Sequence, residues 1–180
     1  MLKTDNFALP LHKHTYFFIM EYNNSNIRRQ DRLLSEDKAY KLLRNGEYGI
    51  LSMLSPENVP YAVPVNYVWN DDDAIYIHCA PEGKKLLCIH HNPSVSFCVV
   101  GDTHVISDKF TTNYESIVLS CHAEIGLSAE ERMYALHKLI EKYAPQFKEI
   151  GKKYAENSFH RTEIIKLNIL SFSGKSKNMM

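Results

Sequence analysis

Residues Ala74 to Gly101 read AIYIHCAPEGKKLLCIHHNPSVSFCVVG, and this stretch says most about the architecture of the chain. The segment from Ala74 to Cys79 carries the β-branched and aromatic side chains typical of a buried strand, and three aspartates in front of it are turn residues. A short helix is predicted over Lys84 to His91, where Asn92-Pro93 closes it. A second strand is predicted over Val95 to Val100. The stretch therefore predicts a strand, a helix and a strand, joined by short turns.

Two lysines stand at the start of this predicted helix. Lys84 and Lys85 follow Gly83 directly, so their charges lie beside backbone N–H groups that have no partner within the first helical turn. Cations next to such N–H groups make an anion site, and phosphate is the anion that fits it best. A solvent-exposed basic turn is the alternative that this feature alone leaves open.

Strands are also predicted on both sides of this stretch. The upstream strand, Tyr61 to Trp69, contains Pro64. Because proline cannot donate a hydrogen bond to a sheet ladder, we expect this strand to have a free or ligand-facing edge. The downstream strand covers Tyr114 to Ala123 and extends to Ile125.

Six short motifs, in this order, resemble the flavin-binding split-barrel family. They are P-V-N-Y, I-Y-I-H-C-A, E-G-K-K, N-P-S-V-S-F, Y-E-S-I-V and the terminal Ser173-Gly174-Lys175. Within the pyridoxamine 5'-phosphate oxidase-like proteins of this family, the chain is most similar to the nitroimidazole-resistance, or Nim-type, flavoproteins. The resemblance runs from about Ile27 to Lys175. It implies a mainly β fold, the FMN-binding split barrel, which is a β-barrel with peripheral helices.

The remaining elements fit an antiparallel barrel with helices around it. A helix is predicted from an N-cap at Ser35 to Asn45-Gly46, and another from a capping box at Ser128 to Pro145. A further helical piece is predicted over Phe147 to Tyr154. The predicted hairpin and last strand cover Tyr48 to Leu54, Val59 to Trp69, and Thr162 to Phe172.

Composition narrows the possible classes of protein. The chain has 180 residues, enough for one domain with a substantial core. We expect residues 1–26 to form a leader or an arm, residues 27–175 the flavin-binding domain and residues 176–180 a tail. With 21 basic and 21 acidic side chains the net charge is zero, which argues against an extended nucleic-acid-binding face. No stretch reaches the ~20 apolar residues of a membrane span, and Leu9 to Met20 makes a poor signal peptide, so a cytoplasmic protein is expected.

The cysteines are expected to be reduced and buried, because they lie in or beside apolar segments and lack CxxC spacing. They are Cys79, Cys88, Cys98 and Cys121. Zinc binding by Cys88, His90 and His91 is disfavoured, since two adjacent histidines cannot share one helix face. No metal site is predicted.

A flavin site needs a phosphate clamp, an apolar slot and donors toward the N5, O4 and N1–O2 edge of the ring. Gly83, Lys84 and Lys85 fit the clamp, and Ser116 is a candidate hydroxyl donor. The strand with the interrupted ladder fits the ring edge, with Val63, Pro64, Val65, Asn66 and Tyr67. The resemblance implies that the ring lies between this strand and the strand end His78, Cys79 and Ala80. It also implies that a second protomer of a homodimer closes the site through Tyr114, Ser116 and Val118.

His78 is the candidate catalytic residue. The segment from Tyr76 to Ala80 reproduces the Y-x-H-x-A motif of Nim-type proteins, whose histidine lies beside the flavin and the substrate space. Cys79 stands where that motif has glycine, which could narrow the pocket. An imidazole at this place could donate a hydrogen bond to a nitro group or relay a proton. A histidine satisfied at the rim of a barrel is the alternative.

Two functions of different classes follow. The first is an FMN-dependent reductase that passes electron pairs from NAD(P)H to a nitroaromatic, nitroimidazole-like or quinone acceptor. The second is a flavin- or haem-binding protein of the same fold without significant turnover. FAD is possible in place of FMN, and a deazaflavin stays open. Pyridoxamine phosphate oxidation is disfavoured, because no Arg-x-His cluster follows Ile164 to bind a second phosphate.

Overall fold

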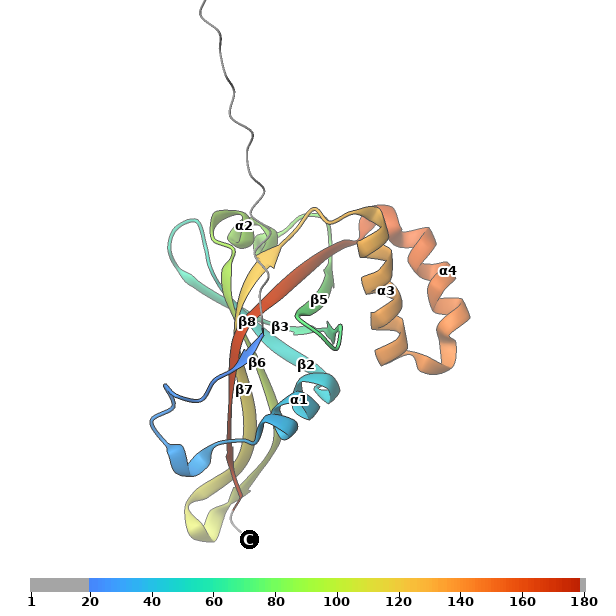
Figure 1. Ribbon diagram of the computed structural model, residues 1–180. Helices are drawn as coiled ribbons and strands as arrows, with labels where there is room; N and C mark the ends of the chain where they lie inside the picture. The colour runs from blue at the N-terminus through green and yellow to red at the C-terminus, as the bar shows by residue number, and fades with distance from the viewer. Residues whose placement is uncertain (1–19, 179–180) are drawn as a thin grey trace, which may run out of the picture.

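The computed structural model describes residues 20–178, which form one sheet of eight strands with helices around it (Figure 1). The strands are β1 (Glu21–Tyr22), β2 (Tyr48–Leu54), β3 (Pro60–Asn66), β4 (Val68–Trp69), β5 (Ala74–Cys79), β6 (Ser94–Ile106), β7 (Thr111–Glu124) and β8 (Glu163–Lys177). The α-helices are α1 (Glu36–Asn45), α2 (Lys84–His91), α3 (Ala129–Tyr143) and α4 (Lys148–Ser158). Within this part of the chain, no helix is long and apolar enough to cross a membrane.

The strand order shows how the sheet closes into a split barrel. The order is β3-β2-β6-β7-β8-β5-β4, with antiparallel neighbours throughout, and β1 pairs in parallel with β8. The edge strands β3 and β4 are consecutive in the chain and only Tyr67 separates them. The two edges of the sheet therefore meet at Tyr67, and the expected antiparallel barrel with peripheral helices is confirmed.

The end of α3 closes this seam. The Tyr143 hydroxyl accepts a hydrogen bond from the backbone N–H of Tyr67 at 3.0 Å. It also lies 2.8 Å from the carbonyl oxygen of Tyr67 and 2.6 Å from that of Glu47, and its single proton serves one of them at a time. Lys142 donates to the carbonyl oxygen of Gly46 at 2.8 Å, and burial lowers the pKa of this lysine to about 8. The backbone groups that the ladder loses at the seam are thus satisfied by α3.

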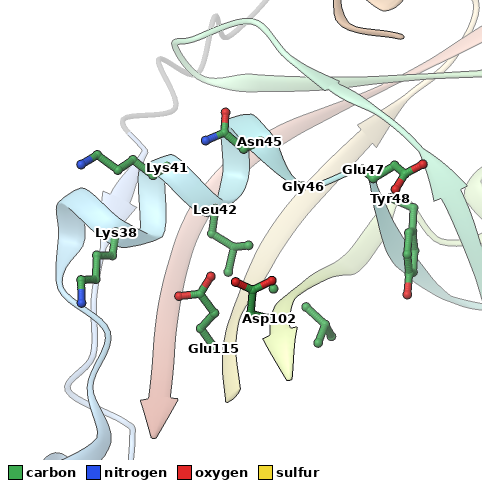
Figure 2. A pocket seen from close by; sticks show the side chains of 11 residues that line it. Lys38, Lys41, Leu42, Asn45, Gly46, Glu47, Tyr48, Asp102 and Glu115 are labelled. Carbon is green, nitrogen blue, oxygen red and sulfur yellow. The ribbon is translucent and has the colours of Figure 1, made fainter. Parts of the chain in front are cut away.

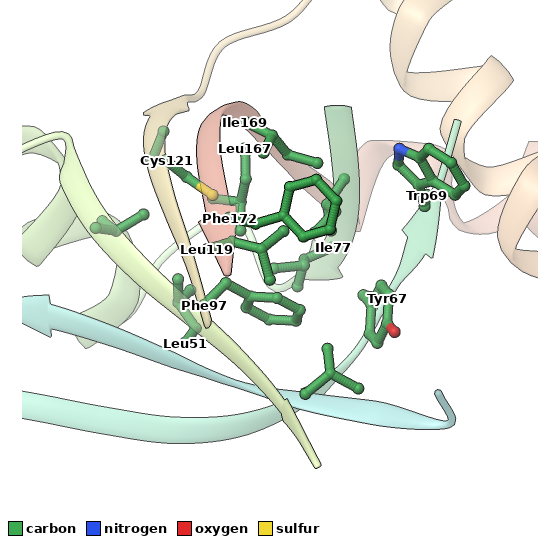
Figure 3. Packing of buried hydrophobic residues seen from close by; sticks show 14 of the residues in the cluster. Leu51, Tyr67, Trp69, Ile77, Phe97, Leu119, Cys121, Leu167, Ile169 and Phe172 are labelled. Carbon is green, nitrogen blue, oxygen red and sulfur yellow. The ribbon is translucent and has the colours of Figure 1, made fainter. Parts of the chain in front are cut away.

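The core fills the inside of the barrel with large apolar side chains (Figure 3). Phe97 is fully buried and meets the Tyr67 ring edge to face, with 5.1 Å between the ring centroids. A Cβ added at Gly49 would lie 2.2 Å from the Phe97 ring, so only glycine fits beneath it. Burial of a side chain as large as that of Phe97 stabilises the fold by ~1.5–3 kcal/mol. Other fully buried members are Leu43, Leu51, Ile75, Ile77, Ile117, Leu119, Ile165 and Leu167.

Helix α3 begins as predicted, with one difference in its cap. The Ser128 hydroxyl oxygen accepts a hydrogen bond from the N–H of Glu131 at 3.1 Å, so this half of the capping box is confirmed. The Glu131 carboxylate, however, accepts from the Tyr76 hydroxyl and from the Lys166 ammonium, both at 2.9 Å. Glu131 therefore fastens α3 to β5 and β8.

Several strands differ from the predicted bounds. β6 and β8 extend well beyond Val100 and Phe172, because their outer parts are held by cross-strand pairing with β7 and not by an apolar face. A bulge between Val100 and Thr103 also interrupts the alternation of inward and outward side chains by which β6 could be recognised in the sequence. The strand predicted over Val59 to Trp69 is broken at Tyr67, where the chain changes edge. Residues 1–19 of the predicted leader lie outside the described residues, while Glu21–Tyr22 pairs with β8.

Candidate cofactor and substrate site

Helix α2 begins where the sequence predicts and carries both lysines on its first turn. Gly83 precedes it with φ +137°, a conformation that L side chains rarely adopt. No atom lies within 4 Å of a Cβ built at Gly83, so backbone conformation, and not lack of space, calls for glycine. No side chain caps this helix start. Lys84 is exposed, with its ammonium 4.6 Å from the centroid of the Tyr61 ring, and Lys85 is half-buried.

His78 lies at the end of β5, exposed to solvent and close to α2. Partial burial lowers the pKa of His78 below its ordinary value, and the positive charge of Lys85 lowers it further. The imidazole is therefore mostly neutral at pH 7, with one donor and one acceptor nitrogen. The imidazole makes no hydrogen bond to the rest of residues 20–178. The alternative interpretation, a rim histidine whose hydrogen bonds are satisfied by the protein, therefore has no support within the described chain.

The strand predicted for the ring edge is an edge strand, as Pro64 indicates. β3 pairs only with β2 in the described chain, and Pro64 lies opposite Ile50. Val63 and Val65 pack against the core, whereas Pro64 and Asn66 are exposed. The free edge leaves backbone N–H and C=O groups available to a ligand.

Tyr67 does not fit the predicted contact with a cofactor. Its side chain is completely buried and its hydroxyl donates to the carbonyl oxygen of Leu43 at 2.6 Å. Its backbone groups are bonded to Tyr143 at the seam. With no free polar group and no exposed surface, Tyr67 belongs to the core, and we withdraw it from the candidate site.

The three candidates on β7 lie apart from the others within one chain. β2 and β6 separate β7 from β3 in the sheet. The three candidates lie on the outward face of the sheet. Pro64 lies on the same face, because a row of cross-strand pairs runs from Pro64 through Ile50 and Cys98 to Val118. The structure thus brings His78, the lysines and the β3 edge to one end of the barrel, but not Tyr114, Ser116 and Val118.

Cys79 and Ala80 complete the strand end beside His78. Cys79 is half-buried, and burial raises the pKa of its thiol, which keeps it protonated at neutral pH. All four cysteines are free, and Cys88 and Cys121 are buried. Among the described residues, no group of three or more His, Cys, Asp and Glu side chains is placed to hold a metal ion.

A cavity that the sequence analysis missed lies next to His78. It has a volume of about 520 Å³ and is bounded by α3, α4, the end of β3 and the end of β5. Asn66 and His78 form part of its wall. The apolar part of the wall comes from Leu136, Leu139, Ile140, Phe147, Ile150 and Tyr154. The sequence signal for this cavity was the helical spacing of apolar residues on both helices. That spacing does not show that the apolar side of α4 stays exposed.

A second cavity, of about 630 Å³, lies between α1 and the strands β6 and β7 (Figure 2). Lys38 and Lys41 of α1 line it together with Asp102 and Glu115. Charges of both signs share this groove, and none of the predicted site residues lines it.

These features define a split-barrel protein with two lysines at an uncapped helix start and a histidine that makes no hydrogen bond within the described chain, both at one end of the barrel. The chain belongs to the pyridoxamine 5'-phosphate oxidase family, whose pattern it matches over residues 35–176. The expected family is thereby confirmed. No curated protein matches the sequence.

Solved structures with the same fold are distant in sequence. A protein from Bacteroides thetaiotaomicron, provisionally assigned to 5-nitroimidazole antibiotic resistance, has a TM-score of 0.68 and 20% identity, covering 81% of this chain and 86% of its own. An FAD and haem binding protein from Mycobacterium smegmatis has a TM-score of 0.67 and 18% identity, with coverages of 82% and 74%. An FAD-binding protein from Mesorhizobium loti has a TM-score of 0.56 and 23% identity, with coverages of 82% and 98%.

Proposed function

We propose that the protein is a flavin-dependent reductase that transfers electron pairs from NAD(P)H to a nitroaromatic or quinone acceptor. The observation that carries this proposal is the meeting of three features at one end of the barrel: the uncapped start of α2 with its two lysines, the unpaired ring of His78, and the free edge of β3. Two structures of the same fold are named as FAD-binding proteins, which supports a flavin in this family.

The residues present fit a flavin phosphate. Lys84, Lys85 and the free N–H groups of the first turn of α2 would hold it, with Gly83 giving the backbone its turn. FMN ends in a phosphate monoester, which matches a site at a helix start. In FAD the adenosine part of the cofactor would extend beyond Lys84. The exposed edge of β3, at Pro64 and Asn66, would face the ring edge. Bound flavin would accept a hydride from the nicotinamide and would then pass the electron pair to the acceptor.

His78 would act on the acceptor side of the site. Its neutral ring can donate a hydrogen bond to an oxygen of a nitro or carbonyl group, and its protonated form can deliver a proton. Cys79 and Ala80 would line the same side.

We further propose a homodimer, in which the outward face of β7 completes the site of the partner. Val118 and Val100 on this face are 47% and 43% exposed in the single chain, and pairing would remove them from water. Light scattering should then give about twice the 20.8 kDa chain mass. Val118→Asp should shift this mass toward that of the monomer, whereas Val59→Asp in the turn before β3 should not. A wild-type monomer that retains flavin would contradict the arrangement.

Steady-state kinetics with the purified protein test the reductase against the binding protein. We expect NAD(P)H oxidation that depends on an added nitroaromatic or quinone and saturates with it. A binding protein would hold its cofactor but show no acceptor-dependent oxidation. Haem is the second candidate ligand, because His78 lies on the wall of an apolar cavity and a structure of the same fold is named as a haem-binding protein. A Soret band in the purified protein would favour it.

A further inference from the structure

The cavity between α3, α4 and the ends of β3 and β5 has the properties of a ligand site in its own right. We propose that it binds an uncharged, mostly apolar ring compound that is larger than a single small heterocycle. Its assignment to the electron acceptor rests on the proposed function, whereas the binding itself does not.

Exposed apolar side chains gather on this cavity. Phe147, Ile150 and Tyr154 are 61%, 69% and 65% exposed, although each is large and apolar or aromatic. Contiguous apolar surface of this kind is costly in water and marks binding sites. Because these side chains line a hollow and not a flat face, a compact ligand covers them best.

The wall also selects against charge. None of the described residues that line the cavity is Asp, Glu, Lys or Arg. The hydroxyls of Ser158 and Thr162 donate to the carbonyl oxygens of Tyr154 and Ser158, at 2.8 and 2.9 Å, and have no proton left to donate to a ligand. A charged group placed there would lose part of its hydration without gaining a counter-charge from the wall. The ligand is therefore neutral, unlike a phosphorylated vitamin.

One end of the cavity is polar. The amide nitrogen of Asn66 donates to the carbonyl oxygen of Glu47 at 3.0 Å, which occupies one of its protons. The ring of His78 keeps both nitrogens free of hydrogen bonds within the described chain. A ligand would therefore turn a carbonyl or nitro oxygen toward His78 and its apolar body toward Phe147 and Ile150.

The size and rigidity of the cavity set the scale of the ligand. Its 520 Å³ falls within the roughly 300–1,000 Å³ of pockets that hold drug-sized molecules. A Cβ added at Gly151 would lie 2.7 Å from a methyl carbon of Ile140, so α3 and α4 are in close contact there. The wall is thus formed by packed helices before any ligand arrives, and a two- or three-ring compound fills it better than one small ring.

Equilibrium dialysis of the purified protein against a matched pair of ring compounds tests this site. The neutral probe is hydroxymethylanthraquinone, and its anionic counterpart is anthraquinone sulfonate. We expect the neutral probe to bind at least tenfold more tightly. Ile150→Lys should weaken its binding at least tenfold, while Val105→Lys should leave it unchanged. Val105 lies on β6 away from the cavity and is as exposed as Ile150, at 69% each, so neither change disturbs the core.

Several outcomes would overturn the proposal. They are equal binding of both probes, no binding to the wild-type protein, normal binding to Ile150→Lys, or tighter binding of haemin in the same assay. Dissociation of a dimer by Ile150→Lys would show that a second copy of the chain covers the cavity. If the neutral probe binds as expected but NAD(P)H oxidation is absent, the site stands and the reductase proposal fails.

Discussion

Replacing both Lys84 and Lys85 by Ala is expected to weaken FMN binding by roughly two to four powers of ten. Each lysine would donate a charge-assisted hydrogen bond to the phosphate, and such a bond contributes about 1.5–3 kcal/mol. Two of them sum to about 3–6 kcal/mol, which gives this loss of affinity. Titration of flavin-stripped protein with FMN, followed by quenching of flavin fluorescence, measures it directly.

A second pair of adjacent lysines provides the control. Lys152 and Lys153 lie on α4, and their replacement by Ala makes the same change in net charge away from α2. This control should bind FMN as the wild type does. If the Lys84 and Lys85 double variant also binds FMN normally, the phosphate does not lie at the start of α2.

His78→Ala is expected to keep the flavin but to slow acceptor-dependent NAD(P)H oxidation by about two powers of ten. That loss is at the lower end of what a positioned acid or base contributes. Because burial and the charge of Lys85 lower the pKa of His78, the protonated ring becomes abundant only in mildly acidic solution. The ratio of wild-type to variant rates should therefore rise as the pH falls toward that pKa. The measurement is the rate at saturating NAD(P)H between pH 8 and 5.5, which are about one and a half units above and one unit below the ordinary histidine pKa.

Two further variants make this test specific. His90→Ala removes an exposed histidine of α2 and should leave the rate unchanged. Lys85→Ala removes a positive charge near His78, so the pKa of His78, followed by NMR, should rise toward its ordinary value. A His78→Ala variant that reacts at the wild-type rate would make His78 a rim residue without a role in the reaction.

Local sequence features were sufficient for the part of the site within one short stretch. Turn residues bound β5, and Gly83 and Asn92-Pro93 bound α2, so the strand end with His78 and the lysines could be predicted together. Pro64 likewise indicated the edge strand β3. In each case the deciding residue restricts its own backbone, which makes the signal independent of distant contacts.

The features that sequence analysis missed depend on tertiary packing. Tyrosine is common in strands, so the sequence places Tyr67 within one. Only the closure of the sheet puts Tyr67 at the seam, where its backbone bonds to the hydroxyl of Tyr143. The cavity beside His78 exists because α3 and α4 pack across the ends of two strands far apart in the sequence. No local pattern in α4 shows which of its apolar residues stay exposed.

The absorbance spectrum of the protein as purified from cells tests the flavin site most directly. A site formed by the start of α2, the end of β5 and the free edge of β3 should retain flavin, with FMN released on denaturation and identified by chromatography. We expect a yellow protein with close to one FMN per chain. A colourless preparation that also fails to quench the fluorescence of added FMN would contradict the flavin site, and with it the proposed reductase.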